Sequence, residues 1–398
     1  MTDCPFHSPA ALPGDSTPTS PSPRFAQWRE AGAAAPLRYE DGHEGFVITR
    51  HEEARSVLSD PRFTVAHHRS PLRESALVDG VAPGPLDDRG RQAVASTSLL
   101  SMDGPQHLRL RRAITRRLSV KAVRTRTAEI EDVVDSVLDE MLAHGAPANL
   151  TAHLAQPISV RVHGLALGVP PHLMAEFTRC FVQGAPAQDR HDLLRLALEH
   201  RRQEPGDDVF SDLVANPGLD RIEVEGLAFV LSTSGRDTVA YVIATAVVAL
   251  LTDRAQYEAL VADPDLVPTA VEELLRFTPM FLTLFPRTSL QDVQVGDQLV
   301  AEGTTVSVSP VGANRDPRRW DDPDALDVSR SARGHLSFGD GPHMCAGQQL
   351  ARVEIAATVR TLVTRLPGLR LVDAEQLRPG PLANPVATYE SGVVTVAW

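Results

Sequence analysis

Apolar residues recur at helical spacing along most of this chain, between stretches rich in charged and turn-forming residues. The most apolar run, residues 239–251, lies between Asp237 and Asp253 and is too short to span a bilayer, so it predicts a buried core helix. The pattern predicts helices over His51–Ser59, Pro105–Leu118, Ala128–His144, Asp189–Arg202, Val224–Leu251, Pro268–Arg276 and Gly347–Leu366.

Strand patterns are few and short. Leu37–Tyr39 and Phe46–Thr49 flank a turn dipeptide and predict paired strands. Turn glycines separate short apolar runs between Arg287 and Val308, which predicts a small β region, and residues 392–398 have one more strand pattern. No repeat and no Gly/Ser linker divides the chain, so we expect one domain that is mainly α with a small β region.

The first 23 residues include six prolines and many Ser and Thr. This composition predicts a loose lead-in and not a signal peptide. We therefore divide the chain into a flexible proline-rich N-terminus, residues 1–24, and a single domain, residues 25–398. With 398 residues, 42% of them hydrophobic, the chain is long enough for a large core.

The net charge of −12 argues against non-specific binding to nucleic acid. Three widely spaced cysteines, Cys4, Cys180 and Cys345, argue against a disulfide framework and favour a reducing compartment. We expect a soluble, cytoplasmic protein that has no membrane or nucleic-acid partner.

Cys345 follows a glycine-rich stretch that begins at Phe338. Glycines allow a backbone to approach a flat, bulky group, and the helix predicted after Cys345 favours a thiolate, which suits a metal ligand. The alternative is a small buried hydrophobic side chain, as most lone cysteines are. A zinc site is disfavoured because His343 and Cys345 lie too close together and no paired Cys or His motif lies elsewhere.

This stretch resembles the cysteine loop of the cytochrome P-450 haem-thiolate enzymes, particularly the soluble bacterial kind. The family pattern FxxGxxxCxG is matched at Phe338, Gly341, Cys345 and Gly347, and the resemblance extends over residues 25–398. It implies a single-domain cytochrome P-450 fold that binds haem b (iron protoporphyrin IX), with Cys345 as the ligand of the iron and Phe338 and Gly347 beside the haem.

A second match is Ser234-Gly235-Arg236-Asp237-Thr238, inside the long apolar helix. An acid beside an alcohol is costly there unless it is used, and a mid-helix glycine costs about 1 kcal/mol relative to alanine. Together they predict a local opening of the helix beside a ligand, although a threonine can also bond back to its own helix. The resemblance implies that Thr238 hydrogen-bonds dioxygen and that Asp237 helps to deliver protons, while Ser234 and Arg236 depart from the usual occupants.

The resemblance also implies two groups of charged residues, each of which alone would be read as surface charge. The haem propionates would be bound by four cations: His107, Arg111, Arg287 and His343. A structural triad would brace the pocket: Glu273, Arg276 and Arg330.

Five arginines fall within nine residues of this acidic chain: Arg109, Arg111, Arg112, Arg116 and Arg117. A solvated face and a nucleic-acid site are the usual interpretations. The resemblance implies a docking face for an acidic electron donor. No flavin or nicotinamide fingerprint is present, so electrons from NAD(P)H would arrive through a ferredoxin reductase and a ferredoxin. The family's usual form is a monomer.

By resemblance, the substrate pocket would be lined by residues 66–100, parts of 171–204, the helix before Thr238 and residues 280–285. The candidates are Ser234, Met280, Phe281, Leu282 and Thr283, with core packing as the alternative. The lid interval 171–204 is short, which predicts an open pocket for a large, extended or carrier-tethered substrate, such as a peptide or polyketide. A small aromatic substrate is the alternative.

We therefore expect a monooxygenase of secondary metabolism that hydroxylates an organic natural product with O2 and electrons from a redox partner. One alternative is oxidative C–C, C–N or C–O coupling of an aromatic or peptide substrate by the same cofactor. Another is a non-catalytic haem-binding or sensor protein. The presence of both Asp237 and Thr238 favours hydroxylation.

Overall fold

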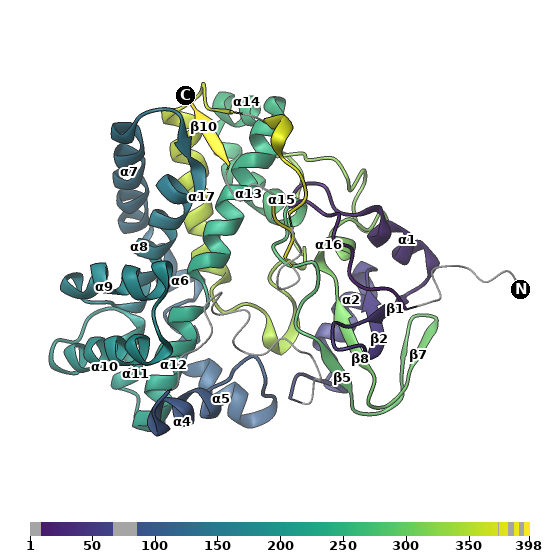
Figure 1. The fold of residues 1–398 in the computed structure, drawn as a ribbon, viewed down its shortest axis with the longest axis horizontal. Helices are drawn as coiled ribbons and strands as arrows, with labels where there is room; N and C mark the ends of the chain where they lie inside the picture. The colour runs from purple at the N-terminus through teal and green to yellow at the C-terminus, as the bar shows by residue number, and fades with distance from the viewer. Residues whose placement is uncertain (1–8, 67–85, 373, 381–385, 390–393) are drawn as a thin grey trace, which may run out of the picture.

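The structure is a computed structural model, and it describes residues 9–66, 86–372, 374–380, 386–389 and 394–398. Most helices fill the left and centre of Figure 1, and the main sheet lies to the right with α1, α2 and α16, while β10 lies among the helices at the upper left. The helices are α1 (Pro23–Ala31), α2 (His51–Ser59), α4 (Asp88–Ser96), α5 (Gly104–Thr115), α6 (Val120–Arg124), α7 (Thr127–His144), α8 (Gln156–Leu167), α9 (Met174–Thr178), α10 (Ala187–Gln203), α11 (Val209–Val214), α12 (Arg221–Thr233), α13 (Arg236–Thr252), α14 (Arg254–Ala262), α15 (Val267–Phe277), α16 (Pro310–Ala313) and α17 (Gln348–Arg365).

The predicted helices agree with these bounds to within a few residues, with one exception. The helix predicted over Val224–Leu251 is two helices, because α12 ends at Thr233 and α13 begins at Arg236. Gly235 lies between them with a φ of 147°, a conformation that glycine adopts without strain.

The main sheet has five strands in the order β1-β2-β8-β5-β3. The predicted pair forms an antiparallel hairpin with Ala34 opposite Ile48, and β8 adds to it in parallel. Smaller sheets contain β4, β10 and β9, or β6 and β7. The strands are β1 (Ala34–Arg38), β2 (Glu44–Ile48), β3 (Phe63–Thr64), β4 (Ala148–Asn149), β5 (Arg287–Ser289), β6 (Val293–Val295), β7 (Gln298–Val300), β8 (Thr305–Val308), β9 (Arg370–Leu371) and β10 (Thr395–Ala397).

The largest core cluster surrounds α13, which runs through the middle of the molecule beside α17 (Figure 1). Its buried residues come mostly from α7, α8, α13, α15 and α17. Among the described residues one helical stretch, Arg221–Thr252, is long and apolar enough to cross a membrane, but 67% of its apolar window is buried inside the protein. This burial agrees with the core helix predicted from the sequence.

The proline-rich segment before α1 contacts the rest of the molecule over its described part. Ala10 forms a bridge with Leu37 of β1, and Thr19 Oγ1 lies 3.3 Å from the hydroxyl of Tyr389. Arg315 donates a hydrogen bond to the backbone oxygen of Thr19 at 3.2 Å. Ala10 and Thr19 of the predicted lead-in thus contact the rest of the molecule, and the flexibility of residues 1–24 stays a prediction.

Candidate functional site

The loop that carries Cys345 is closed by a backbone hydrogen bond, because the Cys345 N–H donates to the Phe338 oxygen at 2.8 Å. Gly341 lies inside this loop with a φ of 70°. A Cβ at Gly341 would lie 2.5 Å from the backbone oxygen of Leu58 in α2, so only glycine fits there. The loop thus rests directly on α2 and presents Cys345 just before α17.

The Cys345 side chain is exposed, although the residue lies deep in the molecule. Burial raises the pKa of the thiol, and this effect outweighs the Gly347 N–H and the nearby Arg111 and Arg352, which lower it. The backbone N–H groups at the helix start lower the thiol pKa as expected, but burial outweighs them. A bound metal cation deprotonates a coordinating thiol directly.

Phe338 is held by a charged pair next to the loop. The Arg352 guanidinium lies 4.6 Å from the Phe338 ring centre, and its Nε donates to Glu272 at 2.6 Å. Burial raises the pKa of Glu272, but hydrogen bonds from His335 and Arg352 outweigh it and lower that pKa to about 2. The Arg352–Glu272 pair therefore holds one face of the Phe338 ring in place.

The structure brings two of the four predicted propionate-binding cations into contact. The His107 and His343 rings stack with their centres 4.3 Å apart. His343 Nε2 donates to Asp103 Oδ1 at 2.7 Å, while Asp103 Oδ2 accepts from Thr64 Oγ1 at 2.5 Å. Burial raises the pKa of Asp103, but the hydrogen bonds from His343, Thr64 and the Val65 N–H hold it well below its usual range.

For the other three predicted propionate-binding residues, His107, Arg111 and Arg287, no ion pair is found within the described part of the chain. His107 Nε2 is buried without a hydrogen bond, and burial, His343 and Arg111 lower the His107 pKa to about 4. Burial lowers the pKa of Arg287 to about 10, opposed only by Asp103. Arg111 donates to the backbone oxygen of Met344.

These features fit a haem. An accessible sulphur, an orphaned imidazole nitrogen and a buried guanidinium are the donors that an iron porphyrin with two carboxylates requires. Among the described residues, no three His, Cys, Asp or Glu side chains come together in a group that could hold a metal ion.

The three residues of the predicted structural triad meet in the interior. Glu273 and Arg276 side chains have 0% exposure and share two hydrogen bonds of 2.7 Å, and Arg330 Nε donates to Glu273 at 3.1 Å. Arg276 also donates to the backbone oxygen of Asn314 at 2.9 Å. Asn314 accepts a bond from the Leu336 N–H at 2.7 Å, two residues before Phe338, so the triad supports the start of the cysteine loop.

The predicted opening of the apolar helix is a complete break at Ser234-Gly235. Thr238 Oγ1 donates to the Gly235 oxygen at 3.0 Å, which is the predicted alternative of a threonine bonding to its own helix. Asp237 is paired with the neighbouring Arg236 at 2.7 Å. Ser234 is exposed, and its hydroxyl donates to the Val230 oxygen at 2.6 Å.

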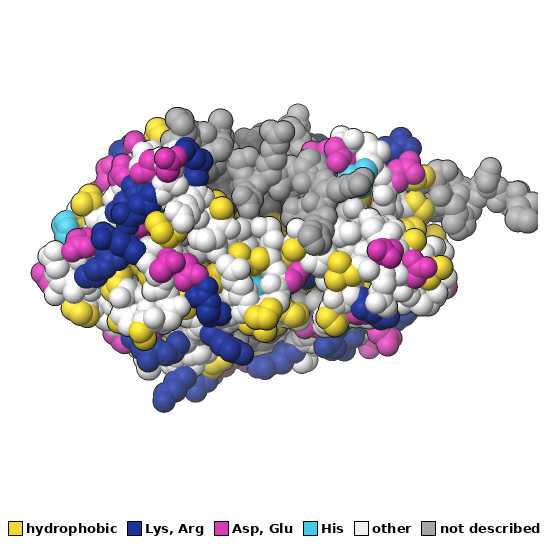
Figure 2. All heavy atoms as spheres, turned by 90° about the horizontal axis from the view of Figure 1, so that it is seen from below, with side chains coloured by type: hydrophobic (Ala, Val, Ile, Leu, Met, Phe, Trp, Pro, Cys, Tyr) yellow, Lys and Arg dark blue, Asp and Glu magenta, His cyan; other side chains and the backbone are white. Residues whose placement is uncertain are grey.

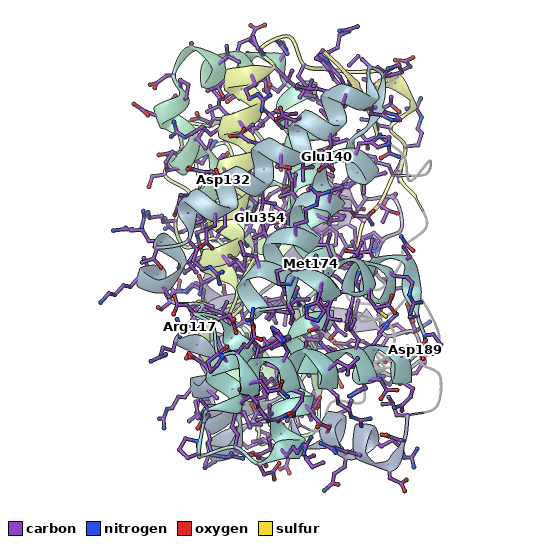
Figure 3. All side chains as sticks on the ribbon, turned by 90° about the vertical axis from the view of Figure 1, so that its left-hand side faces the viewer. Arg117, Asp132, Glu140, Met174, Asp189 and Glu354 are labelled. Carbon is purple, nitrogen blue, oxygen red and sulfur yellow. The ribbon has the colours of Figure 1, made fainter. Side chains whose placement is uncertain are left out.

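One buried acid near this break was missed by the sequence analysis. Glu354 on α17 is buried, and Figure 3 shows it in the middle of the helical part of the molecule. Burial raises its pKa to about 8, opposed by a hydrogen bond with Ser159. The Ser159 hydroxyl donates to the Arg236 oxygen at 2.6 Å, so Glu354 lies close to the opened turn. The available signal was an acid within the apolar run 353–357 of a predicted helix.

The candidate pocket residues divide into two groups. Leu282 packs in a core cluster with Phe25 and Trp28, so its assignment to the pocket is corrected. Met280 and Phe281 are half-buried, and Thr283 is buried. Leu284 lies within van der Waals reach of a Cβ at Gly339, so it faces the cysteine loop. The predicted lining 66–100 falls largely on residues 67–85, outside the described residues.

The predicted lid interval contains two helical segments joined at residues 185–186. The first runs through α9 and a π-helical segment, Arg179–Gly184, and the second is α10. Met174 and Asp189, near the starts of α9 and α10, are labelled in Figure 3.

The predicted basic face is less positive than its sequence indicates. Arg109 pairs with Glu223, and both Arg116 and Arg117 pair with Asp212. In the described part of the chain no ion pair is found for Arg112, which is exposed. Figure 2 shows Lys and Arg gathered along the lower edge of the face seen from below, with acidic side chains among the basic ones to the left.

Comparison with known proteins agrees with this geometry. A family model described as cytochrome P-450 matches residues 251–367. Nocardicin C N-oxygenase from Nocardia uniformis subsp. tsuyamanensis is 39% identical over 381 residues, covering 92% of this chain and 93% of that protein. Among solved structures, cytochrome P-450 MoxA from Nonomuraea recticatena has a TM-score of 0.83 at 32% identity, over 98% of both chains.

A further solved structure is the mycinamicin VIII C21 methyl hydroxylase MycCI from Micromonospora griseorubida, bound to mycinamicin VIII. Its TM-score is 0.82 at 29% identity, over 98% of this chain and 100% of that chain. The predicted fold and enzyme class are confirmed, and the sensor alternative is left without support. The chain belongs to the cytochrome P-450 family of haem-dependent oxidoreductases.

Proposed function

We propose that this monooxygenase hydroxylates a large organic natural product, with Cys345 as the protein ligand of the haem iron. The observation that carries the proposal is the exposed Cys345, set in a closed loop near the buried His107 Nε2, which has no hydrogen-bond partner among the described residues. His107, Arg111, Arg287 and His343 would bind the two propionates. When bound, a thiolate-ligated haem supplies the cleavage of the O–O bond.

The residues of the opened turn would manage the protons. Hydroxylation puts one oxygen atom of O2 into a C–H bond and releases the other as water, which consumes two electrons and two protons. Thr238 can turn its hydroxyl from the Gly235 oxygen toward the dioxygen site, and Asp237 can carry protons from solvent because its side chain is 54% exposed. The acid and alcohol pair favours oxygen insertion, which needs controlled protonation of O2, but it does not exclude oxidative coupling, which also reduces O2 to water with two electrons and two protons.

The carbon monoxide difference spectrum of the reduced holoenzyme tests the ligand. We expect the red-shifted band of a thiolate-bound haem in the wild type and its loss in Cys345→His. Cys180→Ala is the matched control, because Cys180 is buried in a separate core cluster. A wild-type spectrum without the red-shifted band would overturn the proposal.

The electron donor would be a small acidic ferredoxin, itself reduced by NAD(P)H through a ferredoxin reductase. The support is the exposed Arg112 on α5, the helix that also supplies Arg111 to the cysteine loop. A donor at this face would come close to the thiolate side of the haem.

The substrate would be large, as one relative acts on nocardicin C and another binds mycinamicin VIII. The short first lid helix, α9 with its π-helical continuation, supports an open pocket. A spectral-shift screen of peptides, macrolides and small phenols tests this class. A high-spin shift with small phenols alone would contradict it.

A further inference from the structure

Arg236 is the first residue of α13 and the direct neighbour of Asp237. Its side chain is only 6% exposed. A buried guanidinium keeps its charge and needs an anionic partner. Here the partner is Asp237, whose Oδ1 accepts a hydrogen bond from Arg236 Nη1 at 2.7 Å.

Buried groups on two other elements fix the position of Arg236. The guanidinium carbon lies 6.0 Å from the ring centre of Phe181, in the π-helical continuation of α9. Ser159 of α8 donates to the Arg236 backbone oxygen at 2.6 Å. Phe181 and Ser159 are both buried, so Arg236 is held between α8 and the lid.

Asp237 is less constrained than Arg236. Its side chain is half exposed, and no hydrogen-bond partner other than Arg236 is found for it among the residues that the structure describes. A second buried cation, Arg190 of α10, also lies over Phe181, at 5.7 Å. Burial and then Arg236 lower the pKa of Arg190, and Asp237 opposes both effects. Asp237 is thus attracted by two guanidiniums on the lid side of the turn.

We infer that Arg236 is a positioning residue for Asp237, holding its carboxylate beside Thr238 at the opened turn. The inference rests on the proposed role of Asp237 in proton delivery. Arg236 acts through Asp237, since one hydrogen bond and one fixed charge define where an otherwise mobile acid lies. Without it the carboxylate would move among solvent-exposed rotamers, and protons would reach the dioxygen site less often.

Carbodiimide labelling of carboxyl groups in the holoenzyme, read by mass spectrometry, measures the pair without turnover. We expect Arg236→Leu to raise the labelling rate of Asp237 about threefold, the change expected when a partly exposed ion pair is lost. Arg236→Lys should restore the wild-type rate, because the contact is a single N–O hydrogen bond and not a bidentate fork.

Internal controls separate positioning from general loosening. Exposed Asp88 should label equally in all variants, and buried Glu273 should stay unlabelled. Arg161→Leu, which removes an arginine paired with Glu140 on the surface, should leave Asp237 unchanged. An Asp237 rate that is the same in Arg236→Leu and wild type would overturn the inference, as would labelling of Glu273 in that variant.

The second measurement is the fraction of NAD(P)H electrons recovered as hydrogen peroxide, with surrogate ferredoxin and reductase and 7-ethoxycoumarin as the probe. Arg236→Leu should change this fraction by about threefold in the wild-type background and not at all in the Asp237→Asn background. An equal effect in both backgrounds would contradict action through Asp237. If Asp237→Asn and Thr238→Ala leave the fraction unchanged, the proposed proton route fails, while the labelling result still decides the positioning role.

Discussion

The loop of Cys345 and the opened turn of Asp237 are built in opposite ways. The loop is closed by its own backbone bond and supported from outside by the Glu273 triad. The turn is a break between α12 and α13, where the hydrogen bonds found for the Thr238 and Asp237 side chains among the described residues go to Gly235 and Arg236. A metal ligand benefits from a fixed position, whereas groups that move protons must change partners. The difference teaches that this fold holds the Cys345 loop in one conformation and leaves the side chains of the Asp237 turn able to change partners.

The largest expected effect is a loss of stability when the triad that supports the Cys345 loop is broken. Glu273→Gln should lower the free energy of unfolding by about 3–5 kcal/mol, because Arg276 would keep a buried charge without a counterion. Urea unfolding of the holoenzyme measures this. Glu258→Gln, in an exposed pair with Arg254, should cost less than about 1 kcal/mol. Equal losses in the two variants would refute the importance of the triad.

A smaller loss is expected where the loop touches α2. Gly341→Ala should cost about 2–4 kcal/mol and weaken haem retention, because its Cβ would meet the Leu58 oxygen and its φ is positive. Gly303→Ala has a similar φ in open space and should cost only about 1 kcal/mol. If both variants unfold at the same urea concentration, the contact with α2 does not matter.

The pH dependence of stability tests the region of the opened turn, through the buried acid Glu354. Its pKa is raised to about 8 in the folded protein from an ordinary value of 4.5, so between these pH values folding takes up a proton and stability falls as pH rises. Between about pH 5.5 and 7.5 the wild type should lose about 2–3 kcal/mol relative to Glu354→Gln. Parallel stability curves for the two proteins would show that Glu354 is already ionised.

The smallest expected effect concerns the basic face. Arg112→Glu should slow reduction by ferredoxin about threefold at low salt, and the difference should shrink near 1 M salt. The control is Arg161→Glu on α8, where the arginine is already paired with Glu140. Stopped-flow reduction measures both, and equal rates in wild type and Arg112→Glu would remove α5 from the docking face.

Much of the fold could be predicted because its signals are local. The bounds of α2 agree with its apolar pattern, and the turn between β1 and β2 is set by neighbouring residues. The short helices α9 and α11 and the π-helical segments were missed, since tertiary packing and not local pattern stabilises them. The sequence pattern predicts one helix over Val224–Leu251 where the structure has two, because Gly235 in an apolar run indicates a local opening and not a helix end.

The site was predictable where residues act through their spacing. The Cys345 loop and the Glu273–Arg276 pair lie within short motifs whose geometry follows from the sequence. Partners distant in sequence could not be inferred: Asp212 pairs with Arg116 and Arg117, and burial outweighs the lowering of the Cys345 thiol pKa by the helix start. Leu282 was wrongly assigned to the pocket because apolar type does not tell which way a side chain points.

The proline-rich segment also ties the beginning of the chain to its end. The Thr19 hydroxyl contacts the Tyr389 hydroxyl. Ala387, two residues before Tyr389, accepts a hydrogen bond from Tyr241 of α13 at 2.8 Å. Val386 forms a bridge with Phe281 in the pocket segment. Residues 386–389 therefore contact the central helix α13, the segment of Phe281 and the leading residues. A change at Thr19 would therefore be felt at α13, through a segment that lies almost 370 residues further along the chain.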